Sequence, residues 1–138
     1  MQGDVKMTCA IISKSSEKVG TFNEYELPYS KIKEQLRDTI WELYCSGYTD
    51  FYSNCEYGVP LWAAEIIIAL KMYNDIKLHI AMPHEEQATR WAEEYRDRFF
   101  TVHEKADTVK IISTHYTEDC YEKAERYMID ASDKCEYI

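Results

Sequence analysis

The sequence predicts an α/β fold: a Rossmann-like three-layer sandwich with a mainly parallel sheet of four to five strands and helices on both faces. Two observations predict it. Short apolar segments of strand length alternate with longer segments of helical periodicity, and they follow one another in the order βαβαβαβα. Such an order implies right-handed crossovers between parallel strands. All 138 residues are expected to form a single domain.

Apolar runs between turn-forming residues carry the strand prediction. The first run, Met7–Ser13, is continuously apolar, as expected of a strand buried on both faces. The later runs are Asp50–Tyr52, Ile76–Met82 and Thr108–Ser113, and Cys135–Ile138 adds a short fifth strand. The loops that follow parallel strands meet at the carboxyl edge of the sheet, which is where we expect a ligand.

Four helices are predicted between and after these strands. The first begins with Ser30 as its N-cap and ends at Gly47. The others span, in chain order, Leu61–Tyr73, Glu85–Lys105 and Glu118–Ser132. Each carries apolar residues at helical spacing, which predicts one face turned toward the core.

Composition narrows the class of protein. The chain has 25 acidic and 16 basic residues, a net charge of −9, which argues against nucleic acid as a partner. Five cysteines without a CxxC pair, and a beginning that lacks the apolar core of a signal peptide, predict a cytoplasmic protein. No apolar run reaches the length of a membrane span, so no membrane association is expected. No cofactor is predicted.

The stretch Phe51–Glu65 connects a strand to a helix and is the centre of the functional prediction. Ser53 and Asn54 end the strand, Gly58 can adopt a positive φ, and Pro60 suits the first helical turn. Backbone amides and the helix dipole at such a place favour an anionic ligand. A plain structural connection is the alternative, since loops with a single glycine are common.

Four blocks in the second half of the chain are specific enough to compare with known families. They are GYTDFYSNCEYGVPLWAAE, MPHEEQATRW, IISTHYT and RYMIDASD, all within Gly47–Asp133. In order and spacing they resemble the YpsA-like branch of the SLOG superfamily, Rossmann-like domains related to DprA and the LOG phosphoribohydrolases. The resemblance implies a nucleotide or nucleotide-derived ligand, and some members of the superfamily cleave an N-glycosidic bond. The family continues beyond Ser132-Asp133 with a strand, a helix and a strand, so this chain resembles a shortened member.

The family motifs are only partly kept. Where the family has T-G-H-R-P after its first strand, this chain has Ile12–Ser16. In the S-G-x-x-x-G-V-D motif, Asn54 replaces the first Gly and Pro60 replaces the Asp, and P-C-E-G-Q stands as Pro83–Gln87. The late block survives from Arg126 to Asp130. The lost Gly, His and Arg are residue types that bind phosphate, so the resemblance implies a pocket of altered chemistry or one that is lost.

These comparisons predict one set of ligand-binding residues at the carboxyl edge: Ser13, Lys14, Ser53, Asn54, Glu56, Gly58, Glu65, His84, Glu85, Gln87 and Arg126. For most of them a purely structural role stays open. Glu65 orients a ribose or a water, or it pairs with a cation on its helix face. Arg126 binds phosphate, or it pairs with Glu122 or Asp130. Lys14 binds phosphate together with neighbouring serines, or it belongs to an exposed loop.

No catalytic residue and no metal site are predicted. Cys55 stands beside Glu56, and an adjacent carboxylate raises the pKa of a thiol, which opposes a nucleophilic role. The segment His84–Gln87 lacks the i, i+4 histidine spacing of a zinc helix. Trp62, Trp91 and Tyr95 are expected in the core or at an interface and not as platforms for base stacking.

The predicted function is therefore non-catalytic binding of a nucleotide-derived small molecule, for example by an anti-defence sponge that sequesters a signalling nucleotide. A second interpretation is an acidic inhibitor that covers a basic protein surface, such as that of a nucleic-acid-binding host protein. A third is a phosphoribohydrolase-like enzyme, which the missing Arg and glycines disfavour. An open sheet edge at the fourth or fifth strand further predicts a homodimer.

Overall fold

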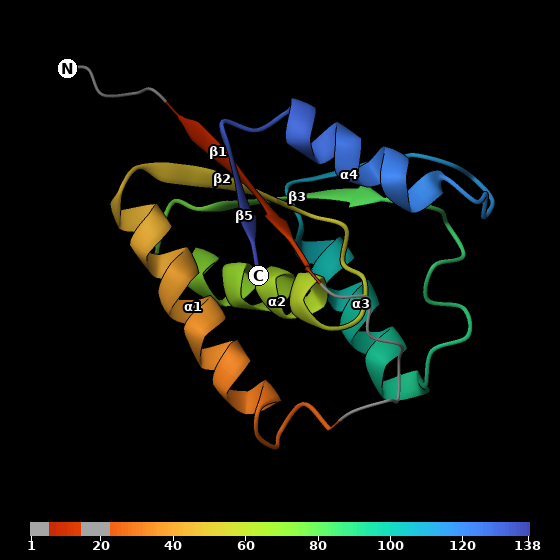
Figure 1. Cartoon of the computed structure of the whole chain (residues 1–138), viewed down its shortest axis with the longest axis horizontal. Helices are drawn as coiled ribbons and strands as arrows, with labels where there is room; N and C mark the ends of the chain where they lie inside the picture. Colours follow the sequence, from red (N-terminus) through yellow and green to blue (C-terminus); the bar gives the residue numbers. More distant parts are fainter. Residues whose placement is uncertain (1–5, 15–22) are drawn as a thin grey trace.

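The fold is an all-parallel five-stranded sheet with four helices, in a computed structural model that describes residues 6–14 and 23–138. Strands β1 to β4 each lead into or follow a helix, and the sheet order is β4-β3-β2-β1-β5 (Figure 1). The elements are β1 (Met7–Ile12), α1 (Tyr29–Cys45), β2 (Tyr48–Ser53), α2 (Val59–Lys71), β3 (Lys77–Met82), α3 (Glu93–Lys105), β4 (Thr108–Ile111), α4 (Cys120–Asp130) and β5 (Lys134–Tyr137). The predicted Rossmann-like α/β sandwich is confirmed.

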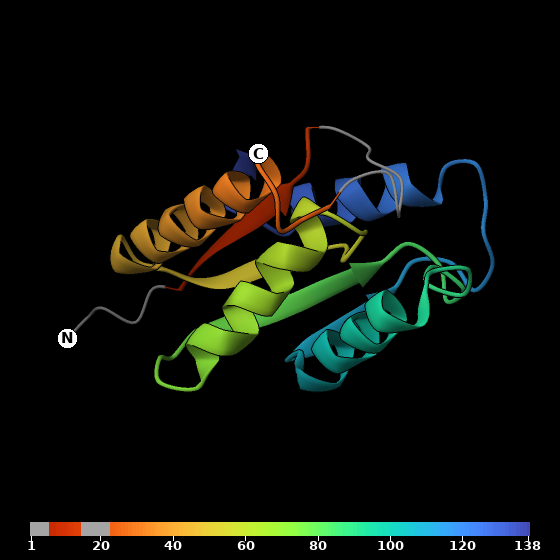
Figure 2. The same cartoon turned by 90° about the horizontal axis from the view of Figure 1, so that it is seen from below.

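The helices cover the two faces of the sheet unequally. Helices α1, α2 and α3 lie on one face and α4 lies alone on the other (Figures 1 and 2). The strand β1 shows why both faces need cover: Cys9 and Ile11 belong to the larger core, while Ala10 and Ile12 belong to the core under α4. The continuous apolar run predicted at the start of the chain is therefore a strand buried on both faces, as expected.

The predicted helix Glu85–Lys105 is too long, because the structure begins α3 only at Glu93. Residues 85–92 instead form successive turns, in which the amides of Gln87, Thr89 and Trp91 each bond a carbonyl three residues earlier. Ala88 and Trp91 are nevertheless buried. The helical spacing of these two residues reflects their burial against the core, and it does not require a helix.

The beginning of α1 also differs from the prediction. The helix starts at Tyr29 with Pro28 as its N-cap and no side-chain cap, so Ser30 lies inside the helix. Strand β2 starts at Tyr48, before the predicted Asp50, because parallel pairing with β1 extends it backward. The fifth strand exists and pairs with β1 in parallel.

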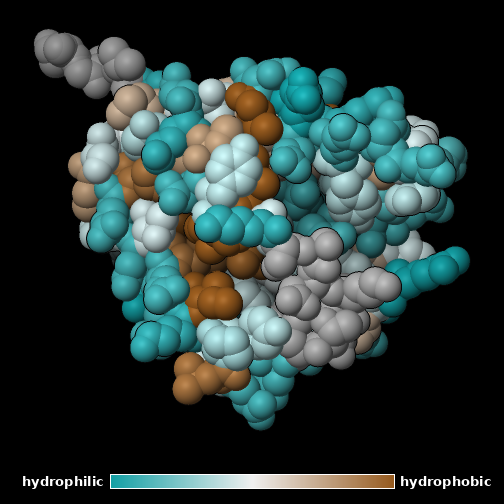
Figure 3. All heavy atoms as spheres, viewed as in Figure 1, coloured by the Kyte–Doolittle hydropathy of each residue, from teal (hydrophilic) through white to brown (hydrophobic). Residues whose placement is uncertain are grey.

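The two edges of the sheet are β4 and β5. All four residues of β4 are exposed. Figure 3 shows hydrophobic side chains reaching the surface in a band over the β5 edge and α1, between hydrophilic surroundings. Among the described residues, no helix combines the length and the apolar character that crossing a membrane requires.

Candidate functional site

The loop between β2 and α2 is held by its own side chains. The buried Ser53 hydroxyl donates to the carbonyl of Pro60 at 2.7 Å and accepts the Cys55 amide at 3.0 Å. The side-chain oxygen of Asn54 accepts the Glu56 amide at 2.9 Å, and the Glu56 carboxylate accepts the amide of Tyr57 at 3.2 Å. Three consecutive amides of this loop are thus bonded within the chain, and a phosphate would have to displace those bonds.

The start of α2 is closed to an anion in the same way. Gly58 has φ 105° and ψ −140°, a conformation that only glycine adopts readily, as its positive-φ prediction required. Pro60 has no amide hydrogen, and the amides of Leu61 and Trp62 donate to the carbonyls of Glu56 and Gly58. The backbone donors that a phosphate loop would offer are used inside the protein.

A cavity of about 340 Å³ lies at the carboxyl edge, between the end of β1, this loop and α4. Its polar lining consists of Ser13, Asn54, Glu56, Tyr121 and Glu125. A second hollow shares Asn54, Tyr121 and Glu125 and adds Glu122, Arg126 and Ile129. The two hollows together form what we call the carboxyl-edge cleft, and it brings together four predicted site residues: Ser13, Asn54, Glu56 and Arg126.

The inner part of this cleft is acidic. Burial raises the pKa of Glu56, and the Tyr57 amide and the side chains of Gln87 and Tyr121 bond to its carboxyl group and partly offset that rise. Burial, with Glu56 nearby, raises the pKa of Tyr121, which stays a neutral hydroxyl. Glu56 and Glu125 offer carboxylate acceptors here, whereas the cation Arg126 lines the outer hollow. The inner part suits ligand groups that donate hydrogen bonds.

The turn after β3 touches the β2–α2 loop directly. The side-chain amide Nε2 of Gln87 donates to the backbone carbonyl oxygen of Asn54 at 3.0 Å, so Gln87 holds the two segments together. His84 is buried edge-on against Tyr116 and Tyr121, and burial lowers its pKa. Within the described residues, His84 Nδ1 and Gln87 Oε1 are buried without a hydrogen-bond partner. Both lie behind the wall of the cleft and do not line it.

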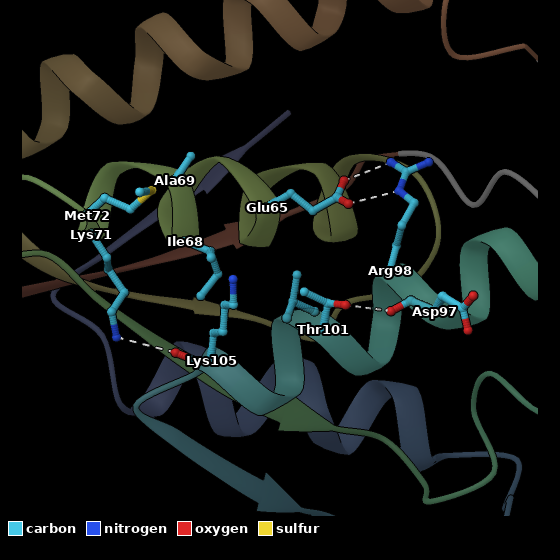
Figure 4. Close-up of a pocket in the computed structure, with 10 residues that line it drawn as sticks. Glu65, Ile68, Ala69, Lys71, Met72, Asp97, Arg98, Thr101 and Lys105 are labelled. Carbon is cyan, nitrogen blue, oxygen red and sulfur yellow. Dashed lines mark hydrogen bonds and ion pairs between the residues drawn. The ribbon is translucent and has the colours of Figure 1, made fainter.

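The remaining predicted site residues lie elsewhere. Glu65 is on the side of α2 that faces α3, where both its oxygens accept from Arg98 at 2.8 and 2.7 Å (Figure 4). Glu85 is exposed, beside a shallow hollow next to α3. Lys14 is exposed, and its backbone amide donates to the Ile138 carbonyl at 2.8 Å. Ser15 and Ser16, the serines that follow Lys14, lie outside the described residues.

Sequence reasoning missed the ion-pair cluster centred on Arg98. Its guanidinium also binds both oxygens of Glu24, at 2.6 and 2.9 Å, and Glu24 further accepts from Lys33 at 3.0 Å. Glu24 is only 1% exposed. The one available signal was position: Arg98 stands next to the buried Phe99 on the inward stripe of α3, where a charge needs a partner.

Two negative predictions can be compared with the geometry. Cys55 is fully buried, and burial raises its pKa to about 12, a poor state for a nucleophile. Across residues 6–14 and 23–138, no three His, Cys, Asp or Glu side chains gather closely enough to hold a metal ion. Trp62 and Trp91 lie in the core, and Tyr95 packs beside them against Tyr57.

Comparison with known proteins places this geometry in a family. The chain matches the family model described as the YspA SLOG family over residues 9–138. It is 31% identical over 99 residues to a UPF0398 protein of Halalkalibacterium halodurans, covering 71% of this chain and 52% of that protein. It is 26% identical over 126 residues to a UPF0398 protein of Ligilactobacillus salivarius, covering 89% of this chain and 69% of that protein.

A UPF0398 protein of Macrococcus caseolyticus is 33% identical over 79 residues, which cover 57% of this chain and 39% of that protein. The chain therefore spans about half the length of the curated relatives it matches first. The family match runs from inside β1 through β5 and includes both the β2–α2 loop and α4. The resemblance in the four sequence blocks is confirmed, and the chain belongs to the YspA SLOG family.

Proposed function

We propose that this protein binds a nucleotide-derived small molecule in the carboxyl-edge cleft and does not turn it over. The observation that carries the proposal is the polar lining of the inner cavity, where Ser13, Asn54, Glu56, Tyr121 and Glu125 converge from three segments far apart in the chain. A cavity of about 340 Å³ is at the small end of the range for ligand sites and suits a nucleoside-sized group.

The chemistry of the lining favours the sugar over the phosphate as the group held inside. The carboxylate oxygens of Glu56 and Glu125 suit the adjacent hydroxyl groups of a sugar, because they accept hydrogen bonds from them, and the Tyr121 hydroxyl can donate or accept. A phosphate group would meet like charge there, and the amides that other phosphate loops offer are bonded within the chain. Arg126, in the outer hollow, is the cation suited to a phosphate.

Two features support binding without catalysis. Glu65, the carboxylate considered for orienting a ribose or a water, is held by Arg98 outside the cleft. The buried Cys55 has a raised pKa. A binding protein of this kind suits the sequestering of a signalling nucleotide, which remains part of the proposal.

Thermal-shift screening with nucleosides, nucleoside monophosphates, cyclic nucleotides and ADP-ribose-type molecules tests the proposal. A ligand present at a hundred times its Kd stabilises the folded state by about 2.7 kcal/mol, and titration calorimetry then gives its affinity. We expect Glu56→Gln and Tyr121→Phe to weaken binding of every active ligand, while the exposed Glu85→Gln serves as the matched control. Arg126→Ala should weaken only phosphorylated ligands.

The outcomes separate the three interpretations. No stabilisation by any member of the panel would refute the small-molecule proposal. Release of a free base, followed by chromatography, would identify an enzyme. The exposed acidic residues near the start of α4, among them Glu118, Asp119 and Glu122, favour the acidic inhibitor as the second candidate. Capture of a purified basic protein, weakened by reversing these charges, would support that candidate.

A further inference from the structure

Another hollow, separate from the carboxyl-edge cleft, lies on the outer surface of the helical layer. It is a groove of about 670 Å³ between α2 and α3 (Figure 4). Its middle is apolar and is lined by Ile68, Ala69, Met72 and Val102. Met72 is 71% exposed and the adjacent Tyr73 is 87% exposed. Ala69 and Met72 are thus exposed within the groove, and Tyr73 follows Met72 outside its lining. Exposed apolar side chains grouped in this way are typical of a binding surface.

The two ends of the groove carry different charges. Both helices run in the same direction along it, from Glu65 and Asp97 at one end to Lys71 and Lys105 at the other (Figure 4). Glu65 is bound to Arg98, and Lys71 is bound to Asp107 at 2.7 Å. Among the ion pairs of the described residues none involves Asp97 or Lys105, so these two side chains contribute the main uncompensated charges at the acidic and the basic end.

We propose that this groove is the interface of a homodimer, in which the α2–α3 face of one copy packs on the same face of a second copy. A two-fold axis perpendicular to the groove sets the two copies antiparallel. Asp97 of each copy then faces Lys105 of the other, and the two apolar middles meet. Because the two ends of one groove carry opposite charges, this symmetry brings the acidic end of each copy against the basic end of the other.

Charge also argues for a second copy at this particular surface. A chain with a net charge of −9 repels another copy unless the contact brings opposite charges together. The edge strand β4 is a weaker candidate, because it has only four residues and carries Lys110, features that protect strand edges from pairing. The interface is independent of the cleft, so it is tested without any ligand.

Light scattering after gel filtration and sedimentation equilibrium of the whole chain test the proposal. We expect a mass twice the 16.3 kDa of one chain. Ala69→Arg places a charge in the apolar middle at an exposed helical position and should give a folded monomer whose circular dichroism spectrum matches that of the wild type. The matched change Thr114→Arg adds the same charge at an exposed position on the distant loop after β4 and should leave the dimer intact.

A charge-exchange series tests the orientation of the copies. Asp97→Lys and Lys105→Glu each create two like-charge contacts in the dimer, and each should raise the dissociation constant roughly tenfold. The double variant D97K/K105E restores opposite charges and should recover most of the affinity. A merely destabilised fold would not recover in this way.

Three results would overturn the proposal. One is a wild-type chain that stays monomeric up to about 1 mM. Another is a double variant that dimerises more weakly than either single variant. The third is a dimer that survives Ala69→Arg but is lost in Tyr137→Glu, since Tyr137 is 49% exposed on β5 and would indicate pairing at that edge of the sheet.

Discussion

At the scale of single residues, Arg98 is the side chain that links the most distant parts of the helical layer. Its planar guanidinium binds two carboxylates at once, Glu24 before α1 and Glu65 on α2. Lysine cannot reproduce this arrangement, because it has no fork of fixed donors. Glu24 is the more buried carboxylate, so the largest penalty follows from removing Arg98, which would leave the buried Glu24 charge with Lys33 as its remaining ion-pair partner among the described residues.

The pKa of Glu24 makes this cluster visible in the pH dependence of stability. Burial alone would raise that pKa, but hydrogen bonds from Arg98 and Lys33 outweigh burial and lower it from 4.5 to about 2. The carboxylate therefore stabilises the fold above about pH 4.5, and this contribution is lost as the pH falls toward 2. Urea unfolding of the wild type should show this loss, whose size is about 3 kcal/mol.

The variant Glu24→Gln should have a free energy of unfolding about 3 kcal/mol lower than that of the wild type at pH 7. Its free energy of unfolding should also change less between pH 5 and pH 2. Glu26→Gln, two residues away and exposed, is the matched control and should follow the wild type. Wild-type and E24Q curves that run parallel over this pH range would contradict a role for the Glu24 charge.

At the scale of elements, the β2–α2 connection shows how a loop can keep its shape while its donors are occupied. Ser53 and Asn54 accept the amides of Cys55 and Glu56, and Gly58 turns the chain into α2 with φ 105°. The shape depends on this glycine, because a side chain at that φ and ψ is strained.

Replacing Gly58 with alanine should lower the free energy of unfolding by about 2 kcal/mol, the typical penalty for a residue forced into a glycine-only conformation. Urea denaturation followed by circular dichroism measures it. Glu85→Ala, in the neighbouring exposed turn, should change stability by less than about 0.5 kcal/mol. A Gly58→Ala variant as stable as the wild type would show that the loop can relax to an ordinary conformation.

At the scale of the whole molecule, the cysteines lie at very different depths. All five are free thiols: Cys45 is exposed at the end of α1, Cys135 is partly exposed, and Cys9, Cys55 and Cys120 are fully buried. Cys9 and Cys55 are in the larger core, where burial raises the pKa of each to about 12. The buried thiols therefore report on opening of the fold.

Thiol modification of the native protein should label Cys45 first and Cys135 more slowly. The three buried cysteines should react only at the rate of opening, and their labelling should rise with urea together with global unfolding. Peptide mass spectrometry identifies the labelled positions, and Cys45→Ser should abolish the fast phase. Fast labelling of Cys55 in the absence of urea would contradict the closed β2–α2 loop described here.

Much of the fold followed from the order of residues along the chain. The strand at Met7, the turn at Gly58 and the alternation of strands and helices depend on residues within a few positions of one another, and the structure confirms them. The predicted start of the third helix at Glu85 was wrong, since α3 begins at Glu93. Ala88 and Trp91 repeat at helical spacing, yet they are buried from turns, and the period of burial is not specific to a helix.

The site was less accessible to sequence reasoning. Asn54 and Glu56 could be assigned to the carboxyl edge from topology. Whether they line one cavity with Tyr121 and Glu125 of α4 depends on how that helix crosses the sheet. The bond between Arg98 and Glu24 joins residues 74 positions apart. Local preferences are encoded by near neighbours, and they set the elements. Contacts across the fold depend on strand register and helix packing, and these define which carboxylates line the cleft and which are held by arginine.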